Sequence, residues 1–246
     1  MKKHGFRVKA TCKTDKRLKE LLSMGLDATL DNREAACWAD VVFIAVKPGQ
    51  VGEVLKEIAG CVKGKLLISV AAAVTTGYIE SLVDARVVRA MPNINAAVGH
   101  SATAVSGGKS STREDVEAAL HLFSMIGYAV ELDEKYLDAV TAFSGSGPAY
   151  VLQFYEALLL AGLKVGLPRR AVEELALHTI AGTARLLEEM SEHPAGLRDM
   201  VITPGGVTID AIHVMEEKGF KAILMSAVEK AYEKSAAISK LISGGK

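Results

Sequence analysis

The sequence has few aromatic residues and no net charge, and the balanced charge argues against partners that are strongly anionic. Of its 246 residues only 5% are aromatic, and 29 basic residues balance 29 acidic ones. A balanced charge gives no overall attraction to nucleic acid or to an anionic membrane surface. We therefore expect neither as a partner, and any anionic ligand must be held by local groups.

Cysteine is also scarce. Cys12, Cys37 and Cys61 are widely spaced and form no C-x-x-C pair, which predicts free core thiols rather than a disulfide framework or a zinc site. No H-E-x-x-H or other metal-ligand spacing occurs among the six histidines, so no metal is expected. His178 stands among apolar neighbours and is predicted to be a core histidine.

Long hydrophobic runs are missing as well. The least charged stretch, Val140–Leu163, contains Glu156 and a Ser-Gly-Ser-Gly-Pro interruption, which makes it a poor membrane span. The amino terminus, Met1–Gly5, has charges but no apolar stretch behind them, unlike a secretory signal. Half of all residues are nevertheless hydrophobic, enough for a dense core. A soluble, cytoplasmic protein is expected.

The first half of the chain alternates short apolar runs with helical periods, the pattern of βαβ units in a parallel sheet. The runs are Phe6–Cys12, Val41–Val46, Leu66–Val70, Val87–Ala90, Ala102–Val105 and Ala129–Leu132. The helical periods between them are Lys16–Met24, Gly49–Ile58, Thr76–Val83 and Arg113–Ile126. After Asp133 only helical patterns follow. The predicted fold is α/β followed by all-α, with domains at residues 1–133 and 134–246.

The helix that starts at Pro148 and runs to Val165 is apolar nearly all round. A helix without a polar face must be covered on every side, which a small helical domain does poorly alone. Subunit association through this helix is one interpretation, and burial within one chain is the other.

In open parallel sheets, ligands bind beyond the carboxyl ends of the strands. Three such ends are followed by small or backbone-restricting residues: Ala45–Gly49, Ala71–Ala73 and Met91–Asn93. These loops let a flat ligand lie close to the main chain. Each could be a simple turn, but three in register favour one crevice.

The loop after the first apolar run bears on the choice of cofactor. NAD sites usually place an acid there for the ribose hydroxyls, whereas NADP sites have cations and hydroxyls for the 2′-phosphate. Lys13 and Thr14 occupy this turn with no acid before them. This favours NADPH, with NADH possible. The alternative is a solvated helix start, capped by Asp15.

A dinucleotide fold also needs a strand followed by G-x-G-x-x-G, where a helix amino terminus receives the pyrophosphate. No such motif precedes Phe6. We therefore expect the first strand of a Rossmann-like domain, with its glycine-rich loop, to be missing from this sequence.

Two further segments, Phe143–Tyr150 and Thr203–Thr208, place glycines and hydroxyls at helix entrances. Exposed amides at the positive end of a helix dipole form a natural carboxylate site. Each could be a tight helix connection, but together they favour a small carboxylic acid as substrate.

At these positions the sequence resembles the pyrroline-5-carboxylate reductase family, over essentially the whole chain. The resemblance rests on motifs in matching order: AVKP from Ala45, MPN from Met91, SGSGPAY from Ser144, GLP from Gly166, HP from His193, LRDMV from Leu197 and PGGVTI from Pro204. It implies NAD(P)H-dependent reduction of 1-pyrroline-5-carboxylate to L-proline, the last step of proline biosynthesis. It also implies a homodimer, or a higher oligomer, interlocked through the helical domain.

The resemblance implies site residues too. Cofactor contacts are expected at Asn32, Ala45, Val46, Lys47, Pro48, Ala71 and Ala72, besides Lys13 and Thr14. The expected substrate pocket, completed across the dimer, consists of Ser144, Ser146, Thr203, Gly205, Gly206 and Thr208. Thr208 and Ser144 are the candidate catalytic residues.

The chemistry asks little of side chains, because a protonated imine is already an electrophile and the cofactor supplies the hydride. Positioning the substrate dominates the catalysis. The main role expected of Thr208 is therefore to orient the ring nitrogen, and its lesser role is to relay a proton. A hydroxyacid dehydrogenase of the same plan would need an acid such as lysine, and the helix after Gly147 offers none before Lys164. An inactive paralogue that only dimerises is the other alternative.

Overall fold

The computed structural model describes residues 5–244, and they form two compact units. The first unit extends to Ser146 and takes up the chain again from Lys230, and the second is Gly147–Glu229. This division lies after the boundary expected near Asp133, because residues 134–146 pack on the first unit. Whether 1–133 and 134–246 are the functional domains stays a prediction.

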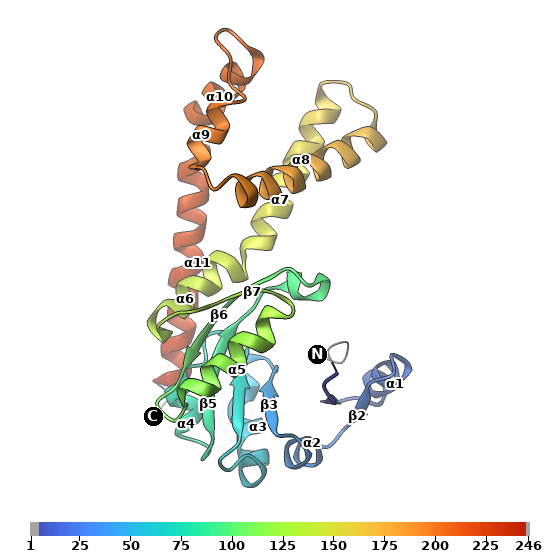
Figure 1. Ribbon diagram of the computed structural model, residues 1–246, viewed down its shortest axis with the longest axis vertical. Coiled ribbons are helices and arrows are strands. Elements are labelled where there is room, and N and C mark those ends of the chain that lie inside the picture. The colour runs from blue at the N-terminus through green and yellow to red at the C-terminus, as the bar shows by residue number, and fades with distance from the viewer. Residues whose placement is uncertain (1–4, 245–246) are drawn as a thin grey trace. The chain divides into compact units, whose positions relative to one another are not determined.

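The first unit holds two separate sheets (Figure 1). In the smaller, β1 (Lys9–Thr11) pairs in parallel with β2 (Asp27–Thr29). The larger has the order β3-β4-β5-β6-β7. Its strands are β3 (Val41–Ile44), β4 (Leu66–Ser69), β5 (Arg86–Met91), β6 (Ser101–Gly107) and β7 (Gly127–Glu131).

One strand departs from the expected parallel arrangement, since β6 runs antiparallel to β5. A parallel neighbour needs a crossover of about a dozen residues or more. The link from Met91 to Ser101 is shorter and holds only the 3-10 turn η4 (Ile94–Val98), so the chain reverses instead.

The helices of this unit lie on both faces of the larger sheet, apart from α1, which packs against β2 of the smaller one. They are α1 (Asp15–Ser23), α2 (Asn32–Trp38), α3 (Val51–Ile58), α4 (Thr76–Glu80), α5 (Arg113–Ser124) and α6 (Leu137–Val140). Short turns are η2 (Pro48–Gln50), η3 (Ala59–Cys61), η5 (Glu134–Tyr136) and the π-helical η6 (Thr141–Gly145). On one face α2, α3 and α4 bury a core around Val42, Ile44 and Leu67, and on the other α5 covers Ile68 and Val88.

Several predictions about this half were wrong or incomplete. Neither β2 nor α2 was predicted from the sequence. Asp31 caps α2 by accepting from the amides of Arg33 and Glu34. The prediction of free thiols was wrong for Cys37 and Cys61, which form a disulfide between α2 and η3. Cys12 is free.

The second unit consists of helices: α7 (Gly147–Lys164), α8 (Arg169–Met190), α9 (Pro194–Asp199), α10 (Val207–Glu217) and the first part of α11 (Phe220–Ser243). Helices α7 and α8 form a hairpin in which Gly162 lies so close to Val172 that a Cβ would come within 2.8 Å of it. Gly166, at φ +89°, ends α7. His178 was predicted to be buried, but its side chain is 78% exposed, beside Glu174. None of the described helices is long and apolar enough to cross a membrane.

The second unit buries little of its apolar surface within one chain. Val172, Ala176 and Leu197 are its only buried hydrophobic residues among those described, and α7 has none. Exposed large side chains include Leu152, Leu160, Leu175, Val207, Ile223 and Met225. An apolar surface of this extent indicates an interaction site.

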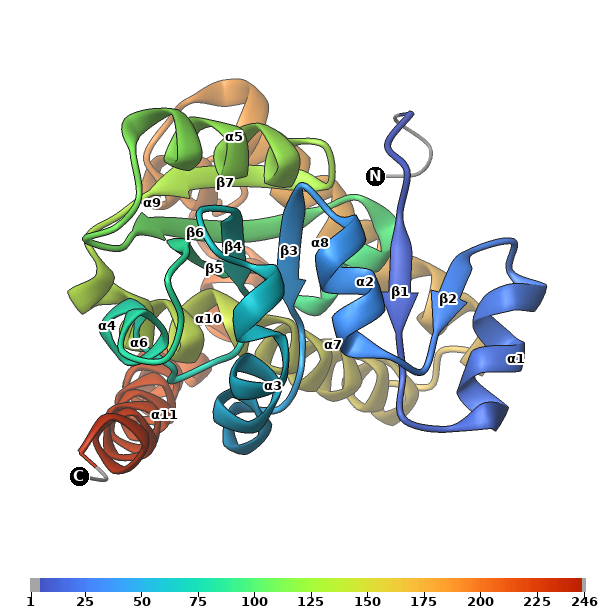
Figure 2. The same cartoon turned by 90° about the horizontal axis from the view of Figure 1, so that it is seen from below.

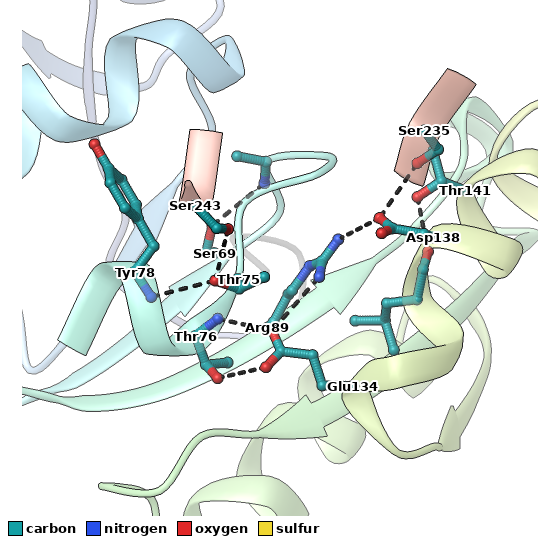
Figure 3. Close-up of polar contacts among 12 residues, drawn as sticks. Ser69, Thr75, Thr76, Tyr78, Arg89, Glu134, Asp138, Thr141, Ser235 and Ser243 are labelled. Carbon is teal, nitrogen blue, oxygen red and sulfur yellow. Dashed lines mark hydrogen bonds and ion pairs between the residues drawn. The ribbon is translucent and has the colours of Figure 1, made fainter. Parts of the chain in front are cut away.

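The end of α11 returns to the first unit, where a buried arginine organises the contact (Figure 3). Arg89 of β5 is 2% exposed, and its guanidinium lies 3.5 Å from Glu134 and 3.5 Å from Asp138. Glu134 also accepts from the amide and the hydroxyl of Thr76, each at 2.7 Å. Ser235 of α11 donates to Asp138. Arg89 thereby ties the sheet to α4, α6 and α11.

Replacing Arg89 should be costly, because it leaves two carboxylates without their cation. We expect Arg89→Met to lower the free energy of unfolding by about 3 kcal/mol. Arg113→Met is the matched control: Arg113 pairs with Glu117 and Glu131 but is 60% exposed, so its loss should cost less than about 1 kcal/mol. Urea unfolding at one protein concentration measures both. Equal losses would contradict the role given to Arg89.

Candidate active site

The loops that follow β3 and β4 have the restricted geometry that the sequence suggested. After β3, Ala45 is exposed, and Lys47 accepts from the amide of Gln50 at 2.9 Å to start η2. After β4, the amide of Ala71 donates to the Ser69 hydroxyl, and Ala73 has φ +61°. A left-handed alanine is uncommon and costs energy, and such strain gathers at functional sites.

The loop after β1 presents the two residues expected to face a 2′-phosphate. Lys13 and Thr14 are both exposed. The Thr14 hydroxyl caps α1 by accepting from the amide of Arg17, at 3.3 Å. Thr14 rather than Asp15 is therefore the cap of this helix.

Beside this loop, charged side chains are already paired. Lys9 donates to Glu34 at 2.7 Å, and Glu34 also accepts from the Thr29 hydroxyl. The hydrogen bond to Glu34 holds the pKa of Lys9 above its ordinary value, and the same bond lowers the pKa of Glu34. Glu34 is therefore an occupied acceptor, and Lys13 has no acidic partner of this kind among the described residues.

A cavity of about 610 Å³ separates the two sheets of the first unit. Of the predicted cofactor contacts, it brings together Asn32, Ala45 and Val46. Asn32 donates to Glu57 of α3 at 2.8 Å. The remaining predicted contacts, Lys13, Thr14, Lys47, Pro48, Ala71 and Ala72, lie outside the lining of this cavity.

The SGSGPAY segment enters α7 through the π-helical turn η6. Ser144 donates to the carbonyl of Val140 at 3.3 Å, and Ser146 donates to that of Thr141 at 3.0 Å. Both hydroxyl protons are therefore engaged, and the oxygens can still accept. A π-turn of this kind is frequent at functional sites.

Asn93 holds this turn in place, a role that the sequence analysis did not assign to it. Its side-chain amide donates to the carbonyl of Ser144 at 3.0 Å, and its Oδ1 accepts from the amide of Asn95. A Cβ on Gly145 would come within 2.8 Å of Met91. The MPN motif was a visible signal for a loop here, but its contact with residue 144 depends on the tertiary fold.

The PGGVTI segment forms the other candidate substrate contact, in the second unit. Gly205 adopts φ +66°, and the amide of Gly206 donates to the carbonyl of Thr203 at 3.0 Å. Gly206 caps α10 without a side chain, so the first amides of the helix receive no side-chain acceptor. Thr208 is half-buried, and no hydrogen bond of its hydroxyl is found among the described residues. This end of α10 can accept a carboxylate.

Comparison with known proteins identifies the family. Residues 134–238 match the family described as pyrroline-5-carboxylate reductase dimerisation, and residues 1–73 match NADP oxidoreductase, coenzyme F420-dependent. The pyrroline-5-carboxylate reductase of Synechocystis is 42% identical over 85% of this chain and 79% of its own length. That of Escherichia coli is 40% identical over 88% of this chain and 81% of its own length.

This chain belongs to the pyrroline-5-carboxylate reductase family. Solved structures agree. The Plasmodium falciparum pyrroline carboxylate reductase with NADP bound is similar at TM-score 0.86 and 33% identity, over 94% of this chain and 87% of that one. The Coxiella burnetii reductase matches at TM-score 0.86 and 32% identity, over 94% and 88%. A Rossmann-like domain followed by a helical dimerisation domain is thus confirmed.

The reductase family membership also accounts for the exposed helices. The matched dimerisation region includes α7, α8, α9 and α10. Since α7 has no buried residue within one chain, the expected association through this helix is supported, and the chain forms a homo-oligomer.

Proposed function

We propose that this chain reduces the cyclic imine of 1-pyrroline-5-carboxylate to L-proline with NADPH, the last step of proline biosynthesis. The observation that carries the proposal is about 40% identity, over most of both chains, to relatives named pyrroline-5-carboxylate reductase. The solved relative with NADP bound supports the cofactor.

The described residues fit such a cofactor in part. Lys13 and Thr14 are exposed where a 2′-phosphate needs donors, and small residues at Ala45, Ala71 and Ala72 let a flat ring approach the backbone. The sequence contains no G-x-G-x-x-G for the pyrophosphate. When bound, the cofactor supplies the hydride, so the protein needs only to bind, orient and exclude water.

For the substrate, we propose that the amides at the start of α10 bind the carboxylate, with Thr203, Gly205 and Gly206 shaping the turn. Thr208 would hold the ring nitrogen, and its hydroxyl is too weak an acid to be a strong proton source. Ser144 and Ser146 would line the other side, positioned by Asn93. That this pocket is completed across the homodimer, as the family resemblance implies, belongs to the same proposal. A higher oligomer and a cytoplasmic location stay predictions.

A hydroxyacid dehydrogenase fits less well. That reaction needs a protonated residue such as lysine near the reacting carbonyl. Lys164 is the last residue of α7, about 25 Å along the helix from Gly147. An imine, which is protonated before the hydride arrives, needs no such group.

Turnover tests the proposed function directly. With 1-pyrroline-5-carboxylate, the chain should oxidise NADPH at high cofactor concentration. It should use NADPH better than NADH if Lys13 and Thr14 bind the 2′-phosphate, as we propose. The same assay is run on a version with an apolar strand and a G-x-G-x-x-G turn added ahead of Phe6. Equal use of NADH would overturn the preference, and no turnover by either version would indicate an inactive paralogue.

Thr208→Ala tests the substrate site. Losing one hydrogen bond to a charged substrate should cost about 1.5 to 3 kcal/mol, or roughly ten- to a hundredfold in kcat/KM. Thr183→Ala is the matched control, because the Thr183 hydroxyl donates only to the carbonyl of Thr179 within α8. Steady-state kinetics compare the two folded variants. If Thr208→Ala stays within about twofold of the unmodified chain, Thr208 is not part of the pocket.

A further inference from the structure

The disulfide between Cys37 and Cys61 lies in the part of the first unit that carries predicted cofactor contacts. Cys37 is in the last turn of α2, and Cys61 ends η3, the short turn that follows α3. Helix α2 lies beside α3 and between β3 and the smaller sheet (Figure 2). The disulfide therefore links a helix at the border of the two sheets to the end of α3.

The two cysteines of this disulfide differ in their access to solvent. Cys37 is exposed, whereas Cys61 is only 8% exposed and packs in the core with Ile58 and Val62. A disulfide is opened by a thiolate that attacks one of its sulfur atoms, so the rate depends on access to that sulfur. Cys37 is therefore the residue that a thiol from solvent can attack, and Cys61 is the residue that leaves as a thiolate.

Helix α2 depends on its contacts with the rest of the unit. It has only seven residues, and a helix of that length is not stable by itself in water. The Lys65 ammonium donates to three carbonyls at the carboxyl end of α2, at 2.7 to 2.9 Å, and the Asn32 side chain donates to Glu57 of α3. These polar contacts do not need the disulfide. They keep Cys37 near Cys61 when the bond is open, which makes its opening reversible.

We propose that Cys37 and Cys61 form a thiol–disulfide exchange site, and that its redox state sets how firmly α2 is held on the first unit. The reductant is a dithiol. One of its thiolates attacks Cys37 Sγ, the bond to Cys61 breaks, and Cys61 leaves as a thiolate and takes up a proton. The second thiolate of the dithiol then attacks the mixed disulfide and releases Cys37, which is also protonated. Two electrons and two protons thus pass to the protein, and the dithiol becomes a disulfide.

Opening the bond removes a cross-link between residues 24 positions apart in the sequence. A cross-link of this span restricts the open states of the chain, so its loss should raise the population in which α2 is detached by roughly ten- to a hundredfold. Asn32, a predicted cofactor contact, is the first residue of α2. Reduction should therefore also loosen this contact, a consequence that rests on the proposed function, whereas the exchange itself does not.

Trp38, the one tryptophan of the sequence, directly follows Cys37 and reports on the bond. A disulfide beside an indole ring quenches its emission, so reduction should raise the emission of Trp38. The whole chain is equilibrated without denaturant in mixtures of dithiothreitol and its oxidised form. Emission should change with a single midpoint, from either direction, and alkylation followed by mass spectrometry should find Cys37 and Cys61 labelled together. Amide hydrogen exchange in α2 should be roughly ten- to a hundredfold faster in the reduced form, with that of α5 unchanged.

Cysteine variants make the test specific. The double variant Cys37→Ser with Cys61→Ser cannot form the bond, so its α2 should exchange as fast as that of the reduced chain, with or without dithiothreitol. Cys12→Ser is the matched control, because Cys12 is a free thiol on the smaller sheet's side, where its sulfur contacts the carbonyl of Thr14. This variant should respond to dithiothreitol with the same midpoint and the same change in α2 as the unmodified chain.

Three results would overturn the exchange site. They are a bond that dithiothreitol opens only after urea has unfolded the chain, cysteines 37 and 61 that stay unpaired in oxidised dithiothreitol, and equal hydrogen exchange of α2 in the two redox forms. The first would make the disulfide a permanent cross-link. If the double variant does not fold, as judged by circular dichroism, the comparison of the two redox forms of the unmodified chain decides the question. None of these measurements depends on catalysis, so their failure is distinct from a failure of the proposed reaction.

Discussion

The hydrogen-bonding capacity of the backbone along β3 is the constraint on which the first unit depends. On one side β3 pairs with β4, and this pair positions the loops in which Ala45 and Ala71 follow the two strands. On the other side it borders a cavity instead of a strand. The loops after β3 and β4 are therefore held from one side only. Lys13 and Thr14 follow β1, whose sheet shares no ladder with β3. Cofactor binding beside β3 should therefore depend on what occupies the cavity next to this strand.

The helical half is constrained differently, by apolar surface rather than by backbone groups. Only Val172, Ala176 and Leu197 are buried among the described hydrophobic residues of the second unit. The helices of this unit therefore leave a large apolar surface that association can cover. The proposed substrate contacts at Thr203 and Thr208 lie in this unit. In this proposal their environment depends on association, whereas the turn at Ser144 is held within the first unit by Asn93 and η6. Assembly and catalysis are linked in this proposal.

Hydrophobic periodicity predicted six of the seven described strands, all but β2, and each of the longer helices. It did not predict β2 or α2, because the three residues Asp27–Thr29 have no apolar run and α2 is only seven residues long. The reversal at β6 follows from the length of its connection, which the pattern does not reveal. The burial of single side chains was harder to predict than the elements themselves. His178 has apolar neighbours in the sequence, but its side chain is exposed in the single chain.

The candidate site could also be predicted only where a local motif carries it. Glycines and hydroxyls at Ser144–Gly147 and Thr203–Thr208 were visible as motifs, because helix entrances need those residue types. Contacts between residues far apart in the sequence were not visible in this way. Neither the hydrogen bond from the Asn93 side-chain amide to the Ser144 carbonyl nor the pairing of Arg89 with Glu134 and Asp138 was predicted. Such contacts arise from the packing of elements, which a local pattern does not encode.

The measurement that tests the account most directly is a calorimetric titration of NADPH into two proteins. One is the 246-residue chain, and the other is the same chain with an apolar strand, a G-x-G-x-x-G turn and a helix added ahead of Phe6. If cofactor binding depends on a continuous sheet and on a helix amino terminus at the pyrophosphate, the extended protein should bind at least about a hundredfold more tightly, while both remain oligomeric. Comparable affinities would contradict the account, since the pyrophosphate would then be held by groups other than those proposed.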